Sequence, residues 1–140
     1  MSQDLLVLDT HIWIWLLNGN IGRLSSEGLS AIEKASQSAQ LGVSAISVWE
    51  VGMLESKGRL RLSKGCLDWV REALTAPGLR LLPLTPEIAI ESSRLPGQIH
   101  GDPADRILAA TARILNGTLV TQDLKLLAYG EQAYLSVLQG

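Results

Sequence analysis

Acidic residues stand where short apolar stretches end or where helical patterns begin. Asp9, Glu50 and Asp123 lie beyond predicted strands, and Asp105 falls in the first turn of a predicted helix. In parallel sheets the carboxyl ends of the strands share one edge, where ligands bind. Four carboxylates at one edge repel one another and tend to take up protons unless a cation lies between them. The spacing therefore favours a site for a hard divalent cation such as Mg²⁺ or Mn²⁺, which prefers oxygen ligands.

Each acid also has a local structural interpretation. Asp9, Asp102 and Asp123 precede predicted helices and could cap them, while Ser47 and Glu50 have the spacing of a capping box. Taken singly, capping is the favoured role of each acid. The cation-site interpretation depends on their number and on their convergence at one edge.

The elements that must position these acids alternate between short apolar strands and helices. The predicted strands cover residues 5–8, 41–44, 79–82, 118–121 and 134–138. The predicted helices cover residues 10–17, a segment capped by Ser25 or Ser26, and residues 47–57, 66–76, 86–93, 103–115 and 124–129. Such alternation predicts an α/β fold with a parallel sheet and helices on both faces.

Length and composition predict one domain over residues 1–140, with 46% apolar residues and a net charge of −2. The longest apolar run, Ile12 to Leu17, is far shorter than the ~20 residues that span a bilayer. Residues 1–4 show no basic secretory signal, and the lone Cys66 excludes an internal disulfide or a multi-cysteine zinc site. We therefore expect a cytoplasmic protein without membrane association.

One segment, residues 57–71, is basic. It holds five bases against the single acid Asp68. Composition alone favours an ordinary solvated loop and helix face over a phosphate-binding patch. The bases are Lys57, Arg59, Arg61, Lys64 and Arg71.

Four motifs occur in order along the chain. They are Leu-Val-Leu-Asp9-Thr10, Ser47-Val-Trp-Glu50-Val, Asp102-Pro-Ala-Asp105-Arg106-Ile-Leu-Ala-Ala-Thr-Ala and Leu-Val-Thr121-Gln-Asp123. Together they resemble a PIN domain and, more narrowly, the ribonuclease toxins of VapBC toxin–antitoxin modules. The resemblance runs from residue 5 to residue 138. It implies a three-layer α/β/α fold, a Mg²⁺- or Mn²⁺-dependent endoribonuclease, a cognate antitoxin that blocks the site, and a toxin homodimer.

The resemblance also implies roles for individual residues. Asp9, Glu50 and Asp105 would bind the metal, with Asp123 as the fourth acid, and water activated there would attack an RNA phosphodiester in line. The product ends would be 5′-phosphate and 3′-hydroxyl. The supporting residues would be Thr10, Ser47 and Thr121, whose hydroxyls orient the acids, and Asp102, which we interpret as a helix cap. Lys57, Arg59 and Arg61 would contact RNA, whereas Gln122 departs from the basic or small residue common at its position.

Three alternatives remain open at this point. His11 and His100 could act as general base and acid of a metal-independent ribonuclease, although ordinary structural roles are favoured for both. Asp9 could be the nucleophile of a phosphotransferase, but that chemistry usually needs a second Asp two residues on, where this chain has His11. The domain could also be a non-catalytic module that binds a partner, with acids that only cap helices.

Overall fold

The computed structural model describes residues 4–140 and contains a five-stranded, all-parallel sheet in the order β3-β2-β1-β4-β5. The strands are β1 (Leu6–Leu8), β2 (Leu41–Ser44), β3 (Leu79–Leu82), β4 (Thr118–Thr121) and β5 (Ser136–Gln139). The helices are α1 (Thr10–Leu17), α2 (Ser26–Gln37), α3 (Ala45–Ser56), α4 (Cys66–Ala73), α5 (Pro86–Ser93), α6 (Pro103–Ile114) and α7 (Leu124–Glu131), with a 3₁₀ turn η1 (Ile21–Arg23). The predicted α/β class is confirmed.

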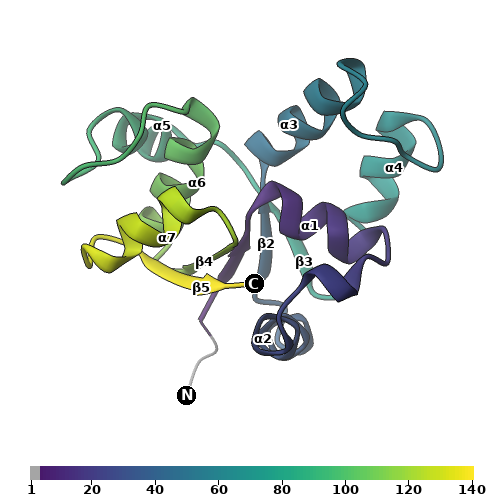
Figure 1. Ribbon diagram of the computed structural model, residues 1–140, viewed down its shortest axis with the longest axis horizontal. Helices are drawn as coiled ribbons and strands as arrows, with labels where there is room; N and C mark the ends of the chain where they lie inside the picture. Colours follow the sequence, from purple (N-terminus) through teal and green to yellow (C-terminus); the bar gives the residue numbers. More distant parts are fainter. Residues whose placement is uncertain (1–3) are drawn as a thin grey trace.

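Two hydrophobic clusters lie on opposite faces of the sheet, as the alternation of side chains along a strand requires. Leu6 and Leu8 of β1 join the cluster formed with α1, α2, α3 and α4, whereas Val7 joins the cluster formed with α5, α6 and α7. Figure 1 shows α1, α2 and α4 on one side of the sheet and α5, α6 and α7 on the other. The predicted three-layer α/β/α arrangement is confirmed.

Helix α6 packs against the sheet mainly through small buried side chains. Ala109, Ala110 and Ala112 have no exposed surface. The helix begins after the N-cap Asp102, which accepts a hydrogen bond from the Asp105 amide at 3.1 Å, and Pro103 occupies the first turn. The sequence predicted this start correctly.

The predicted capping box of Ser47 and Glu50 is wrong. Strand β2 passes directly into α3, so Ser44 is the N-cap and accepts a hydrogen bond from the Ile46 amide at 3.1 Å. Ser47 lies inside the helix and is completely buried. Glu50 is therefore in the second turn, where no backbone amide of the helix start needs its carboxylate.

The remaining boundaries differ by a few residues. Helix α4 ends at Ala73 rather than residue 76, α7 extends to Glu131, and β5 begins at Ser136. No helix in residues 4–140 is long and apolar enough to cross a membrane.

Candidate active site at the carboxyl edge of the sheet

Five acidic side chains line one pocket of about 460 Å³ at the carboxyl edge of the sheet. They come from the ends of β1 and β4 and from the helices α3 and α6, which lie far apart in sequence. The acids are Asp9, Glu50, Asp102, Asp105 and Asp123, and the pocket is completed by His11, Ile12, Trp15 and Gln122. All four acids that the sequence analysis assigned to the metal, and Asp102, are thus brought to one place.

The pairing of β1 with β4 positions Asp9. Leu8 is in register with Val120, so Asp9 lies beside Thr121. The Thr121 hydroxyl donates to Asp9 Oδ2 at 2.7 Å and accepts from the Asp123 amide at 3.0 Å. Asp9 Oδ1 accepts from the Thr10 amide at 2.7 Å, so this acid does cap α1. Capping and pocket lining are therefore compatible in one side chain.

Two buried hydroxyls position Glu50. The Thr10 hydroxyl donates to Glu50 Oε1 at 2.5 Å and lies 2.8 Å from the Ser47 hydroxyl. The Thr10 hydroxyl has a single proton and donates it to the Glu50 carboxylate, so Ser47 is the donor in the hydrogen bond between the two hydroxyls. Thr10 and Ser47 are both inaccessible to solvent, so helix α3 is joined to helix α1 by a dry polar chain that ends at Glu50.

His100 positions Asp105. His100 Nε2 lies 2.7 Å from Asp105 Oδ2, and both side chains are 17% exposed. Arg106 ties the loop that carries this histidine to α5, because its guanidinium donates to the His100 carbonyl at 3.5 Å and to the Ser92 carbonyl of α5 at 2.9 Å. Asp123 accepts from the amides of Lys125 and Leu126 at 2.8 and 3.1 Å and so caps α7.

Burial and mutual repulsion make these acids hard to ionise. Desolvation raises the pKa of Asp9 and of Asp105 above the usual range, and the other acids of the pocket add to the effect. Burial, followed by the charges of Asp9, Asp105 and Asp102, raises the pKa of Glu50 to about 7 despite its hydrogen bond from Thr10. The pocket therefore carries negative charge that its own environment disfavours.

The donor set fits a hard divalent cation. The pocket lining contains five carboxylates and, among the described residues, no lysine or arginine that could neutralise them. Within residues 4–140, no group of three or more acidic, histidine or cysteine side chains is already arranged to hold a metal ion. The carboxylates nevertheless repel one another, and no lysine or arginine among the described residues of the pocket relieves that repulsion. Mg²⁺ and Mn²⁺ bind such carboxylate oxygens, together with water and phosphate oxygens.

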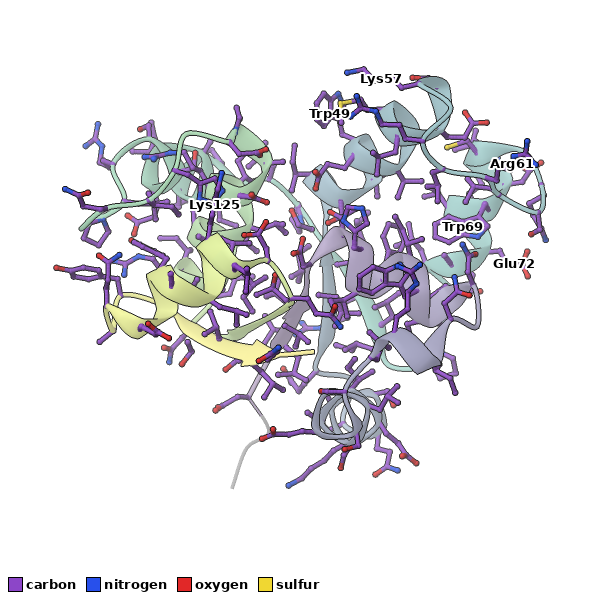
Figure 2. All side chains as sticks on the ribbon, viewed as in Figure 1. Trp49, Lys57, Arg61, Trp69, Glu72 and Lys125 are labelled. Carbon is purple, nitrogen blue, oxygen red and sulfur yellow. The ribbon has the colours of Figure 1, made fainter. Side chains whose placement is uncertain are left out.

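The predicted RNA-binding bases lie away from this pocket. Lys57 is the C-cap of α3, at its outer end, and Arg61 lies on the connector before α4, as Figure 2 shows. Arg61 lines a different hollow of about 700 Å³ with Trp69 and Glu72. Arg59, on the same connector, is also absent from the pocket lining.

Four residues around the acids have positions that the sequence did not predict. Trp15 and Gln122 line the pocket, and His100 and Arg106 hold the start of α6. The two histidines line different pockets, since His100 lies beside α7 with Lys125 and Tyr129, so they do not form a facing acid–base pair. A basic side chain five residues before a first-turn acid was the only signal for the His100–Asp105 contact.

Comparison with known proteins places this geometry in a family. The family model described as PIN domain matches residues 6–132. The chain is 36% identical over 120 residues to Ribonuclease VapC22 of Mycobacterium tuberculosis, covering 86% of this chain and 88% of that protein. A chain of VapBC2 from Rickettsia felis, crystallised with promoter DNA, shares the fold with a TM-score of 0.69 at 18% identity, covering 96% of this chain and 97% of that one. A chain of DNA-bound VapBC from Salmonella typhimurium shares the fold with a TM-score of 0.67 at 16% identity, covering 96% of this chain and 96% of that one. The chain belongs to the PIN domain family, among its VapC-type members.

Proposed function

We propose that this protein is a Mg²⁺- or Mn²⁺-dependent endoribonuclease that acts as the toxin of a type II toxin–antitoxin pair. The observation that carries the proposal is the convergence of Asp9, Glu50, Asp105 and Asp123 on one pocket whose burial and repulsion raise the pKa of three of them. The likeness to a protein named a ribonuclease supports RNA as the substrate.

The four acids would hold the cation, with Asp102 as the cap of α6 and an outer member of the pocket. A bound Mg²⁺ or Mn²⁺ would lower the pKa of water and neutralise charge on the phosphate in the transition state. The hydrolysis adds the oxygen of water to phosphorus and breaks the bond to the 3′ oxygen, which leaves as a hydroxyl. The products would carry 5′-phosphate and 3′-hydroxyl ends.

The protein itself contributes orientation. Thr121 fixes Asp9, and the chain from Ser47 through Thr10 fixes Glu50, so both carboxylates keep their direction in the absence of substrate. His100 fixes Asp105 in the same way. Preorganised acids of this kind lower the cost of arranging charges at the moment of reaction.

The test is cleavage of single-stranded RNA by wild type and Asp105→Asn, with and without EDTA. We expect cleavage that needs added Mg²⁺ or Mn²⁺ and falls at least about a hundredfold in the variant. Mass spectrometry of the products should find 5′-phosphate ends. Equal cleavage by EDTA-treated protein, or cyclic phosphate ends, would contradict the proposal.

We further propose that an antitoxin protein covers the acid pocket and that the toxin forms a homodimer. VapBC crystal structures among the fold neighbours support the first point. Exposed apolar side chains support the second, since Leu81 on the edge strand β3 and Leu115 after α6 are 49% and 40% exposed and line one groove. Co-expression with the product of the neighbouring small gene should suppress toxicity, and sedimentation should give twice the monomer mass.

A further inference from the structure

We propose that Trp15 and Arg23 form a nucleotide subsite beside the acid pocket, which stacks one unpaired base of the RNA and binds its phosphate. The inference rests on the proposed ribonuclease function and goes beyond it, because it names where a neighbouring nucleotide is held. It also favours a single-stranded segment as the substrate, since a paired base has no free face for an aromatic ring.

Trp15 is an aromatic side chain that the hydrophobic core does not fully enclose. Trp13, two residues earlier in α1, has no exposed surface and packs edge-on against Trp69 with ring centroids 5.3 Å apart. Trp15 instead lies on the wall of the acid pocket and is only partly buried. The ring of His11, which is exposed, lies 5.8 Å from it at a tilt of 47°. Two aromatic rings therefore flank the acids that would cut the RNA.

Arg23 brings the positive charge that the pocket lining lacks. Its guanidinium carbon lies 5.3 Å from the centroid of the Trp15 ring, in cation–π geometry. Within residues 4–140, the Arg23 side chain makes no hydrogen bond or ion pair that would occupy its donors. The N–H groups of a guanidinium held over an aromatic ring remain available to other partners, and phosphate is the partner that they suit.

Gln122 ties this pair to the acid edge. Its side-chain amide donates to the Arg23 carbonyl at 2.5 Å and to the Gly140 carbonyl at 2.8 Å. Gln122 itself precedes Asp123 at the end of β4 and lines the same pocket. The turn that carries Arg23 is therefore held at a fixed position relative to Asp123. This contact gives a physical role to the residue at which the sequence departs from the family pattern.

Charge complementarity explains why a nucleotide suits this wall. The five acids repel the phosphates on either side of the bond to be cut, and a single divalent cation offsets only part of that charge. The basic segment over residues 57–71 does not line the pocket. Arg23 is held against a wall residue of the pocket, so it can receive a phosphate adjacent to the scissile one while Trp15 stacks the base.

The test measures binding of a fluorescent single-stranded RNA to wild type, Trp15→Leu, Trp15→Phe and Arg23→Gln in Ca²⁺, with cleavage checked on gels. The matched control is Arg71→Gln, an exposed arginine on α4 outside the pocket. We expect Trp15→Leu to weaken binding about tenfold and Trp15→Phe to restore most of it. Arg23→Gln should weaken binding several-fold. It should also reduce the slope of log Kd against log salt concentration by about one. Arg71→Gln should bind as wild type.

Cleavage kinetics in Mn²⁺ separate this role from a structural one. Both Trp15→Leu and Arg23→Gln should raise KM and leave kcat within about twofold, because neither side chain touches the reacting atoms. Wild-type RNA affinity in both variants would overturn the subsite. Equal losses in Trp15→Phe and Trp15→Leu would also overturn it, because packing rather than stacking would then be responsible. If wild type binds RNA through these residues but does not cleave it, the ribonuclease function fails and the subsite stands.

Discussion

Glu50 shows most clearly that the acid pocket lowers the stability of the metal-free protein. Its pKa is about 7, chiefly because of burial, so at neutral pH and above the folded protein holds a charge that its surroundings disfavour. We expect Glu50→Gln to abolish RNA cleavage and yet to raise the free energy of unfolding of the metal-free protein at about pH 8. Glutamine keeps an oxygen that accepts the Thr10 hydrogen bond. Urea unfolding in EDTA measures the difference.

The control for this substitution is Glu55→Gln, on the same helix but exposed and away from the pocket. It should leave cleavage and stability close to those of wild type. A Glu50→Gln protein less stable than wild type at about pH 8 would show that Glu50 is stabilised as a carboxylate, contrary to the direction of its pKa.

The same pKa predicts how stability changes with pH. The folded protein binds the Glu50 proton more tightly than the unfolded chain, whose glutamate pKa is near 4.5. The contribution of Glu50 to stability is therefore fully present below its unfolded pKa and is lost as pH rises through the range from 4.5 to about 7. Burial shifts the pKa of Asp9 and Asp105 in the same direction. The stability advantage of Glu50→Gln in EDTA should disappear at about pH 4.5; an advantage that persists there would contradict this account.

At the scale of the elements, the contact between α1 and α3 positions Glu50 through Thr10 and Ser47. We expect Ser47→Ala to lower the free energy of unfolding by about 1 kcal/mol, because Thr10 loses its buried hydroxyl partner. Activity should fall about tenfold, because Glu50 is less firmly oriented. Ser56→Ala, also in α3 but exposed and bonded only to the Met53 carbonyl, is the control. Equal activity of Ser47→Ala and Ser56→Ala would contradict a role of Ser47 in positioning Glu50.

The elements also explain what the sequence could and could not predict. Short apolar strands followed by acids predicted the sheet, its layers and the common edge, because strand ends in a parallel sheet face one way. The start of α3 was mispredicted because Ser44, the actual N-cap, is also the last residue of β2, whereas Ser47 with Glu50 imitates a capping box. The Trp15–Arg23 contact depends on how the turn after α1 folds back against that helix, and the five-residue spacing of His100 and Asp105 is too common a pattern to predict their contact.

At the scale of the whole molecule, the acids join parts of the fold that otherwise meet only at the sheet edge. Asp9 begins α1 on one face, whereas Asp105 and Asp123 begin α6 and α7 on the other. A cation bound between them stabilises the folded state alone, by about 2.7 kcal/mol at a hundredfold excess over Kd. We expect Mn²⁺ to raise the Tm of wild type, and to raise that of Glu50→Gln and Asp105→Asn much less.

Hydrogen exchange locates this stabilisation. Slower exchange in Mn²⁺ should concentrate at the amides of Asp105 and Arg106 in the first turn of α6 and of Thr10 at the start of α1, because these turns carry the acids that the cation would link. Amides of α2, whose capping serine lies outside the pocket, should exchange at the same rate with and without metal. Protection spread evenly over the chain, or a rise in Tm equal in wild type and Glu50→Gln, would indicate weak surface binding of Mn²⁺. The carboxyl edge of the sheet would then have no role as a metal site, because a cation held there must act first on the turns that supply its ligands.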